Sequence, residues 1–371
     1  MVTRAPIPLA RPMTGDEELD AVRAVLESGQ LSQGPKVAEF EAMVAELTGV
    51  RHAFATSSCT TALHLALVAI GIGPGDEVLV PDFTFPATAN VVVQQGAVPV
   101  LVDVDLRTYN VDPDDLARHV TARTRAMIPV DLFGLAADMG PITDFARAHG
   151  LIVVEDAACA IGATYHGRPC GSLGDLGCFS FHPRKVITTG EGGMVVTDRD
   201  DLAERLQLLR SHGGVRRSDR FTFEDAGFNY RLSDVQAAVG TVQMRRLPEL
   251  VSRRRRLANR LKAGLADVPG FTVPSEPPWG GHVYQAFVGL VDAHVDRDGV
   301  IAALRARGLE ATLGTYALHA QPFFARTFGY EPGALPGSHA AFLRSVALPL
   351  YPQMTEDDVD ALVDGVRAVL S

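Results

Sequence analysis

Short apolar runs alternate with helix-like stretches through the first two thirds of the chain, and this alternation restricts the fold more than any other feature. Several runs are almost continuously hydrophobic, as expected for strands covered on both faces of a mostly parallel sheet. Seven strands are expected, at residues 51–56, 77–81, 98–104, 125–132, 151–155, 177–181 and 193–197. Four helices are expected between them, at residues 60–70, 86–95, 138–149 and 201–212. This order of elements predicts an α/β sandwich.

The character of the sequence changes near Leu247, so we predict two domains. Residues 1–246 would form a large α/β domain with an N-terminal arm, and residues 247–371 a smaller α+β domain. In the second part we expect an arginine-rich helix from Pro248 to Lys262, a strand at 284–291 and helices near 296–307 and 356–370. The arginine run 253–256 is interpreted as a solvated helix face, with an anion site as the alternative.

Composition excludes several classes of protein. The 371 residues include 34 basic and 44 acidic ones, a net charge of −10, whereas a nucleic-acid-binding protein needs a basic surface. The four cysteines form no CxxC pair, so neither a zinc site nor a disulfide scaffold is predicted. Acidic residues come early, unlike in a secretory signal, and no apolar run approaches the roughly 18 residues of a membrane helix. We expect a soluble, cytosolic enzyme with no metal and no nucleic-acid or membrane partner.

Lysine is rare: only three of the 34 basic residues are lysines, namely Lys36, Lys185 and Lys262. Lys185 follows a predicted strand and lies in a loop closed by glycines. Only a primary amine condenses with an aldehyde to form a Schiff base, and a guanidinium cannot replace it. The adjacent cation of Arg184 is expected to lower the pKa of this lysine and so favour its neutral amine. The alternative is an ordinary surface lysine.

Two further segments lie where open α/β sheets bind ligands. Residues 57–61 join a strand to a helix, and the unpaired backbone N–H groups of a helix N-terminus suit a phosphate. An ordinary helix N-cap is the alternative. Asp156 ends a buried strand, and a buried carboxylate needs a partner. That partner is either a cationic ring nitrogen of a cofactor or one of the many arginines.

Taken together, these segments resemble the DegT/DnrJ/EryC1/StrS family of sugar aminotransferases. The similarity extends from Pro12 and residues 26–29 to residues 348–352, and its motifs, among them residues 177–193, are long and keep their order. The resemblance implies the cofactor pyridoxal 5′-phosphate (PLP), with pyridoxamine 5′-phosphate (PMP) as its amino form. It also implies the α/β aspartate aminotransferase-like fold (fold type I), with a large domain and a smaller C-terminal one, and a homodimer with shared active sites.

The resemblance also assigns roles to residues of the cofactor site. Lys185 would hold the cofactor as a Schiff base and act as the proton shuttle, and Asp156 would pair with the pyridinium nitrogen. Cys59, Thr60 and Ser180 are expected at the cofactor phosphate. Phe85 would stack on the ring face, although without the family it reads as a core aromatic.

Other positions are less regular. Asn229 matches an asparagine that reaches the cofactor phosphate of the neighbouring subunit, with a helix cap as the alternative. Family members commonly carry glycine at Cys59, and glutamine at Cys159, where the side chain contacts the phenolic oxygen of the cofactor. A thiol is a weak hydrogen-bond partner, so a water is a candidate to replace that contact. Asp131 and Leu135 stand where histidine and glutamine are usual, and are expected to alter the substrate pocket.

The reaction implied by the resemblance moves an amino group from L-glutamate, or glutamine, to a nucleotide-linked keto-deoxy sugar, with a dTDP-4-keto-6-deoxyhexose as the expected acceptor. Lys185 argues against the dehydratase branch, which has histidine there, and the motif around it favours amination at C4 over C3. Tyr316 and His319 either line the sugar site or have a structural role. Alternatives are a cyclitol ketone as acceptor and a PLP-binding regulator without turnover. A nicotinamide dehydrogenase is disfavoured, because no dinucleotide fingerprint occurs in a strand–helix context.

Overall fold

All seven expected strands form one sheet in the computed structural model, which describes residues 5–217, 220–331 and 333–371. The strands are β1 (His52–Thr56), β2 (Glu77–Pro81), β4 (Val98–Val102), β5 (Thr124–Met127), β6 (Ile152–Asp156), β9 (Leu176–Ser180) and β10 (Gly193–Thr197). Their spatial order is β1-β10-β9-β6-β5-β2-β4. The strand β10 pairs antiparallel with both of its neighbours, β1 and β9, and the other pairs of this sheet are parallel. The α/β fold with a mostly parallel sheet is therefore confirmed.

The bounds of β5 differ most from expectation, because the predicted strand continues to residue 132. The observed strand stops at Met127, two residues before Pro129. Proline has no N–H to donate to a neighbouring strand. Beyond it the chain turns toward β6, where the backbone N–H of Asp131 donates to the carbonyl of Asp156 over 3.0 Å.

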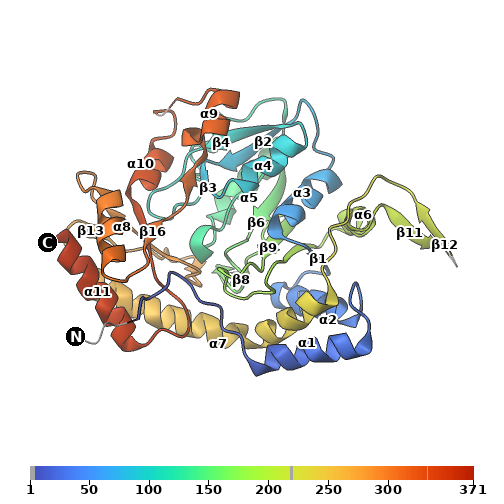
Figure 1. Ribbon diagram of the computed structural model, residues 1–371. Coiled ribbons are helices and arrows are strands. Elements are labelled where there is room, and N and C mark those ends of the chain that lie inside the picture. The colour runs from blue at the N-terminus through green and yellow to red at the C-terminus, as the bar shows by residue number, and fades with distance from the viewer. Residues whose placement is uncertain (1–4, 218–219, 332) are drawn as a thin grey trace.

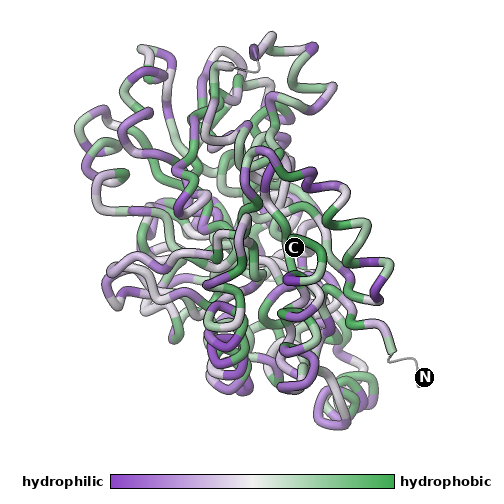
Figure 2. The backbone as a smooth tube through the Cα atoms, turned by 90° about the vertical axis from the view of Figure 1, so that its left-hand side faces the viewer, coloured by the Kyte–Doolittle hydropathy of each residue, from purple (hydrophilic) through white to green (hydrophobic). Residues whose placement is uncertain are grey.

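Helices cover both faces of the sheet (Figure 1). Val78 and Val80 pack with α3 (Cys59–Ala69), α4 (Ala87–Gln94) and α6 (Asp200–Arg210), whereas Leu79 between them packs with the opposite layer. That layer contains α2 (Pro35–Thr48), α5 (Met139–His149) and part of α7 (Asp234–Leu265). Successive side chains of a strand point to opposite faces, so burial on both sides explains the nearly continuous hydrophobic runs. Surface helices alternate between hydrophilic and hydrophobic residues in Figure 2, since each buries one face.

The helix α7 corrects two expectations. It spans 32 residues with Pro248 in its interior, so the expected helix start at Pro248 is wrong. Its first half packs on α1 (Asp16–Ser28) and α2, and its second half packs on α11 (Glu356–Leu370), as Figure 1 shows along the bottom of the view. These contacts hold a helix that an interior proline disfavours by about 3 kcal/mol. The predicted domain boundary at residue 247 lies inside α7, and the division remains a proposal.

The C-terminal part contains its own antiparallel sheet. The strands lie in the order β13 (Phe271–Thr272), β15 (Phe287–Val291), β18 (Ser345–Leu348) and β16 (Thr312–Leu313). They share a hydrophobic core with α11, α8 (Arg297–Ala306) and the end of α7. The strand expected from residue 284 begins at 287, because Tyr284 has the left-handed φ of 50°. Ile7 of the N-terminal arm pairs with Leu309 and belongs to the same core, so the arm packs on the C-terminal part.

Another segment of the C-terminal part returns to the large sheet. The strand β17 (Tyr316–Ala317) pairs with β3 (Phe83–Thr84) and is followed by η3 (Leu318–Ala320), α9 (Pro322–Phe328) and α10 (Pro336–Arg344). Leu318, Phe324 and Leu335 belong to the same core cluster as α3 and α4. The two predicted domains thus share a substantial apolar contact.

The remaining elements are short. The structure has the 3-10 helices η1 (Leu116–Arg118) and η2 (Leu132–Gly134), and a small sheet of β7 (Thr164–Tyr165), β8 (Arg168–Pro169) and β14 (Gly280–Gly281). A hairpin of β11 (Gly214–Arg217) and β12 (Arg220–Phe223) extends away from the body of the molecule (Figure 1). Among the described residues, no helix is both long and apolar enough to cross a membrane.

Arg254 shows that the run 253–256 is not simply a solvated helix face. Its side chain is buried, and Nη1 donates to the carbonyls of Tyr284, Gln285 and Leu350 over 3.1–3.2 Å. Burial lowers the pKa of its guanidinium to about 10, so it stays charged at neutral pH. The guanidinium of Arg254 thereby connects α7 to two segments of the C-terminal part, at residues 284–285 and at residue 350.

We expect Arg254→Ala to lower the free energy of unfolding by about 3 kcal/mol, because three buried carbonyls lose their donor. Chemical denaturation of the purified protein measures this change. Arg256→Ala is the control: Arg256 is exposed on the same helix, and its loss is expected to change stability by less than about 0.5 kcal/mol. Equal effects of the two substitutions would contradict the role of Arg254.

Candidate active site

A cavity of about 560 Å³ lies at the carboxyl ends of β6 and β9 and is closed by residues of the C-terminal part. This volume is typical of small-molecule sites. Eight of the ten residues predicted from the sequence line it: Cys59, Thr60, Phe85, Asp156, Cys159, Ser180, Lys185 and Tyr316. His319 and Asn229 are not among its lining residues. The fold therefore gathers residues that lie up to 257 positions apart (59 to 316) around one space.

Lys185 lies in the turn that follows β9. Its backbone N–H donates to the carbonyl of His182 over 2.8 Å, and its amine Nζ donates to Sγ of Cys159 over 3.1 Å. Burial acts to lower the pKa of this amine, but the neighbouring Cys159, Cys59 and Asp156 outweigh it and raise the pKa. The expected lowering by Arg184 is thus wrong, because Cys159 and Asp156 lie beside the amine whereas Arg184 is exposed.

Asp156 is the last residue of β6, and its carboxylate is buried. Oδ2 accepts a hydrogen bond from Oγ1 of Thr88 over 2.8 Å, and Oδ1 accepts one from the backbone N–H of Ala158 over 3.2 Å. Burial raises the pKa of this carboxyl, while these donors and the charge of Lys185 act to lower it. Among the described residues no arginine forms an ion pair with Asp156, so the carboxylate is free to receive a cationic group from the cavity.

Thr88 is a residue of the candidate site that the sequence reasoning missed. It lies in the first turn of α4, four residues after Thr84 at the end of β3, and the two hydroxyl groups are 3.1 Å apart. The signal was present in the motif at residues 84–88, but the partner Asp156 lies 68 residues further along the chain.

The start of α3 forms another wall of the cavity. Ser58 caps the helix, since its Oγ accepts a hydrogen bond from the backbone N–H of Thr61 over 3.1 Å, and Ser58, Cys59 and Thr60 also line the cavity. Both readings of this segment, cap and anion site, are therefore compatible. Gly193 of β10 approaches closely: a Cβ there would lie 2.4 Å from the carbonyl of Ser58. Burial raises the pKa of the Cys59 thiol well above its usual value, so this side chain stays neutral.

Two aromatic side chains stand in the open part of the cavity. Phe85 directly follows β3 and is 63% exposed, and Tyr316 lies in β17 and is 38% exposed. Both side chains are exposed although β3 and β17 pair with each other. The reading of Phe85 as a core aromatic is therefore excluded. Both rings are available to a ligand.

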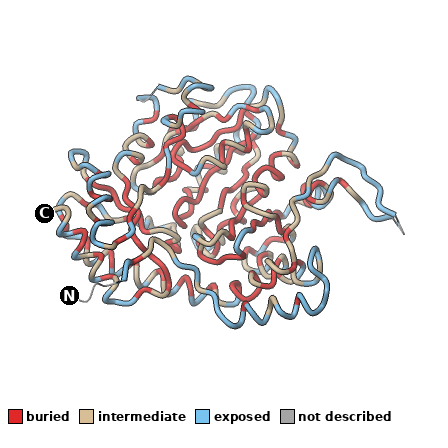
Figure 3. The backbone as a smooth tube through the Cα atoms, in the orientation of Figure 1, coloured by how far each residue is buried: buried red, intermediate tan, exposed pale blue. Residues whose placement is uncertain are grey.

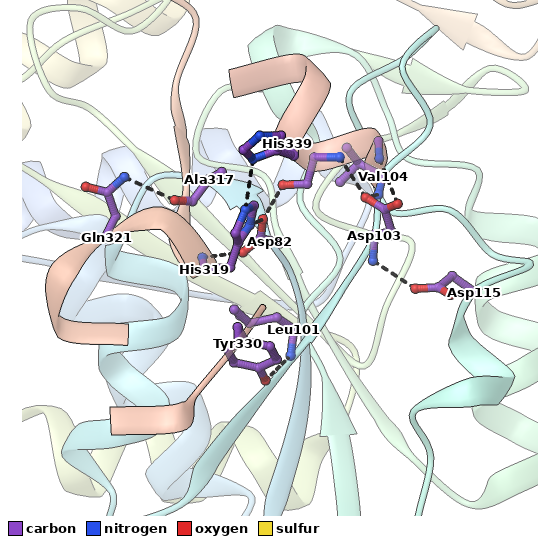
Figure 4. Close-up of polar contacts among 12 residues, drawn as sticks. Asp82, Leu101, Asp103, Val104, Asp115, Ala317, His319, Gln321, Tyr330 and His339 are labelled. Carbon is purple, nitrogen blue, oxygen red and sulfur yellow. Dashed lines mark hydrogen bonds and ion pairs between the residues drawn. The ribbon is translucent and has the colours of Figure 1, made fainter. Parts of the chain in front are cut away.

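His319 is not among the residues that line the cavity, and its contacts agree with the structural role, the second of its two readings. It is buried, its Nδ1 lies 2.6 Å from Oδ2 of Asp82, and its backbone N–H donates to Oδ1 over 2.7 Å (Figure 4). Its Nε2 lies 3.3 Å from Nδ1 of His339, and Ser338 also donates to Asp82. The histidine therefore fastens the segment after Tyr316 to the large sheet, because Asp82 follows β2.

Asp131 and Leu135, which are expected to alter the substrate pocket, are both buried and are not among the residues that line the cavity. Glu155 accepts backbone N–H bonds from Gly171 (2.6 Å) and Leu173 (2.9 Å), which stabilise its charge. Burial and then the charge of Glu155 raise the pKa of Asp131 well above its usual value. Burial also raises the pKa of Glu155. We infer that the pair holds one proton, carried by Asp131.

The same pair has a third potential ligating side chain beside it. The ligating atoms of Asp131, Glu155 and Cys170 lie within 4.8 Å of one another. Both oxygens of Glu155 already accept backbone N–H groups, and burial raises the pKa of the Cys170 thiol well above its usual value. A shared proton satisfies this geometry, and the absence of a metal site stays a prediction.

The cavity residues fit one kind of cofactor. A helix start binds a phosphate, a buried carboxylate without a protein cation suits a protonated ring nitrogen, and an amine beside them suits an aldehyde. Asp156 and the amine of Lys185 are near enough to influence each other's pKa. An α/β fold with a mostly parallel sheet and this site defines the class of fold type I PLP enzymes.

Comparison with known proteins identifies the family. Residues 12–367 match the model of the DegT/DnrJ/EryC1/StrS aminotransferase family, and the chain belongs to it. The chain is 41% identical to GDP-perosamine synthase of Caulobacter vibrioides (98% of both chains covered). It is 40% identical to the spore coat polysaccharide biosynthesis protein SpsC of Bacillus subtilis (98% of this chain and 97% of that protein). The protein is thus an aminotransferase.

A solved structure supports the fold and the cofactor. Spr1654 from Streptococcus pneumoniae, solved in a PLP form and a PMP form, matches with a TM-score of 0.93 over 98% of both chains, at 27% and 26% identity. Together with the family, this likeness indicates pyridoxal phosphate as the cofactor of the present protein.

The shared proton makes stability depend on pH. The folded-state pKa of Asp131 lies above its unfolded-state value, so the stabilising contribution is full at acidic pH and is lost as the pH rises through the raised pKa. Asp131→Asn keeps a donor toward Glu155 and does not titrate. We expect the wild type to lose more free energy of unfolding than this variant as the pH rises from about 4, the unfolded-state value, to pH 9, as measured by denaturation at each pH.

The control for this prediction is Asp114→Asn, which removes one exposed carboxylate. It is expected to keep the pH dependence of the wild type. A variant at residue 131 that loses as much stability as the wild type at pH 9 would show that no proton is shared.

Proposed function

We propose that this protein transfers an amino group from L-glutamate to the keto group of a nucleotide-linked keto-deoxy sugar, with amination at C4 of a dTDP-4-keto-6-deoxyhexose. The single observation that carries this proposal is the convergence of Lys185, Asp156 and the start of α3 on one cavity. The printed functions of the relatives, a perosamine synthase and a polysaccharide biosynthesis protein, support a sugar as the acceptor. A cytosolic location, expected from the sequence, is part of the same proposal.

Each residue has a defined task in this reaction. PLP, when bound, supplies an aldehyde that carries the amino group and a ring that accepts electrons. The amine of Lys185 binds the aldehyde and, once released, moves a proton to and from the donor α-carbon. Asp156, held by Thr88, keeps the ring nitrogen protonated. Release of 2-oxoglutarate ends the first half of the reaction, and the sugar ketone then receives the amino group by the reverse proton path.

The remaining cavity residues bind and orient. We assign the phosphate to the backbone N–H groups of Cys59 and Thr60 and to the hydroxyl of Ser180, because a helix N-terminus attracts anions. Phe85 stacks on the ring and Tyr316 contacts the sugar, since both aromatic rings are exposed in the cavity. The thiol of Cys159 accepts a hydrogen bond from Nζ of Lys185, so it would hold the amine of Lys185 whenever that amine is not bound to the cofactor.

We propose a homodimer in which Asn229 binds the cofactor phosphate of the partner. Asn229 is exposed, lies outside the cavity of its own chain and follows the hairpin β11–β12. That hairpin extends from the body of the molecule, and its described residues after Gly214 are exposed (Figure 3), with Phe221 and Phe223 63% and 67% exposed. Large exposed aromatics beside a predicted shared residue favour a second copy of this chain as the covering surface.

A GDP-linked 4-keto sugar is a second candidate acceptor, favoured by the 41% identity to GDP-perosamine synthase. A panel of dTDP- and GDP-linked keto sugars and cyclitol ketones, incubated with glutamate and analysed by product mass, separates these acceptors. A protein that aminates only the cyclitol ketone would overturn the proposal of a sugar nucleotide.

We expect the PLP-loaded protein to absorb in the near-visible through the lysine-bound cofactor, and L-glutamate to bleach this band. Borohydride should fix the cofactor to the peptide that contains Lys185. Lys185→Ala removes the bound band and lowers the rate of amino transfer by at least about a thousandfold, because the covalent anchor and the proton-transfer group are lost together.

Lys262→Ala is the matched control and should keep both the band and the rate, since Lys262 lies outside the cavity beside Tyr284. A label on Lys36 or Lys262 would refute the assignment of Lys185. An unbleached band in the presence of glutamate would favour a regulator without turnover.

The shared site is tested by mixing subunits. Lys185→Ala and Asn229→Ala homodimers are each expected to be defective, whereas hybrid dimers regain one complete site, formed by Lys185 of one subunit and Asn229 of the other. Activity and cofactor absorbance should recover after the mixture is exchanged. Mixing Lys185→Ala with the double variant is the control without recovery, and an equally inactive first mixture would exclude sharing.

A further inference from the structure

The cavity contains two side chains with permanent or nearly permanent positive charge, Lys185 and Arg184. The third basic residue is His182, whose pKa is lowered, first by burial, so it is neutral at neutral pH. Lys185 is committed to the cofactor in the proposed reaction. Among the described residues that line the cavity, Arg184 is then the one cation left for a substrate.

The backbone of Arg184 is fixed on both sides. Its N–H donates to Nδ1 of His182 over 3.2 Å, and its carbonyl accepts a hydrogen bond from Nε2 of Gln285 over 2.8 Å. Gln285 belongs to the C-terminal part, so this second contact ties the loop of Lys185 to the opposite wall of the cavity. These two hydrogen bonds fix the backbone from which the Arg184 side chain extends.

The guanidinium of Arg184, in contrast, is exposed, and no hydrogen bond or ion pair of this group is found within the described part of the chain. Arg199, by comparison, contacts both Asp175 and Asp201. A free guanidinium has five N–H donors in a planar fork that matches a carboxylate or a phosphate. Asp156 and Glu191, the acidic residues of the cavity lining, would repel an anionic substrate that lacked such a partner.

We propose that Arg184 is a specificity-determining residue that binds an anionic group of the substrates, a carboxylate of the amino donor or a phosphate of the sugar nucleotide. This inference rests on the proposed function, in which both substrates are anions and occupy the same cavity in turn. The contact forms in the bound substrate and persists through the reaction, so its loss weakens binding more than it slows the chemical steps.

The test uses the PLP-loaded protein and the variants Arg184→Gln, Arg184→Lys and Arg256→Gln. Calorimetry measures binding of glutarate, a dicarboxylate without an amine, and of dTDP and GDP. We expect Arg184→Gln to raise the dissociation constant at least tenfold for glutarate or for the nucleotides, and Arg184→Lys to raise it less, because a lysine keeps the charge but loses the fork. Arg256→Gln, an exposed arginine on α7, should leave all of these constants unchanged.

Kinetics of the two half-reactions provide the second readout. The donor half is followed by the bleaching of the cofactor band with glutamate, and the acceptor half by its return with the keto sugar nucleotide. Arg184→Gln should raise the half-saturating concentration at least tenfold in one half, with the limiting rate changed less than threefold. A raised half-saturating concentration of glutamate in the donor half identifies the donor carboxylate as the ligand of Arg184. A raised half-saturating concentration of the keto sugar nucleotide in the acceptor half identifies the phosphate.

An Arg184→Gln variant that stays within twofold of the wild type for every probe and in both halves would overturn the inference. The failure of the proposed function looks different: the wild type itself would then show no bleaching by glutamate. Retained cofactor absorbance in Arg184→Gln shows that the variant is folded, since the loop that carries Lys185 must be intact to hold it.

Discussion

The buried carboxylate of Asp156 is the constraint on which the site depends. Helices cover both faces of the sheet, so a polar group can face a ligand only at the ends of the strands. The strand β6 ends in the acidic side chain of Asp156. The surrounding protein contributes a hydroxyl from Thr88 and a backbone N–H from Ala158, which orient the carboxylate without neutralising it. The charge therefore remains available to a cation, and the amine of Lys185 lies across the same cavity.

The cavity is a joint product of the two parts of the chain. Its floor comes from the large sheet, whereas residues around Gln285, Tyr316 and Leu348 close it from the C-terminal side. Two buried polar anchors hold this second wall: Arg254 binds three carbonyls of the C-terminal segments, and Asp82 binds His319. These contacts leave little freedom for the C-terminal wall to shift, because breaking them would leave buried polar groups without hydrogen-bond partners.

Local pattern was enough to predict the seven strands, since strands covered on both faces need continuous apolar residues. It was not enough for α7, because the contacts with α1, α2 and α11 that carry a helix past Pro248 come from distant parts of the chain. The same limit applies to Arg254, which reads as solvated in a run of arginines. Its acceptor in Leu350 lies 96 residues away. Thr88 was overlooked for the same reason.

The sequence by itself determined the candidate chemistry of this protein: a lysine where 31 of the 34 basic residues are arginines, an acid at a strand end and a hydroxyl-rich helix start are local features whose meaning follows from residue type. The tertiary structure alone decided which neighbouring residues face the ligand. Tyr316 stands in the cavity while His319, three residues later, is buried against Asp82. This difference between Tyr316 and His319 depends on the pairing of β17 with β3, which lie more than 200 residues apart in the sequence. A short stretch of sequence does not reveal such a long-range contact.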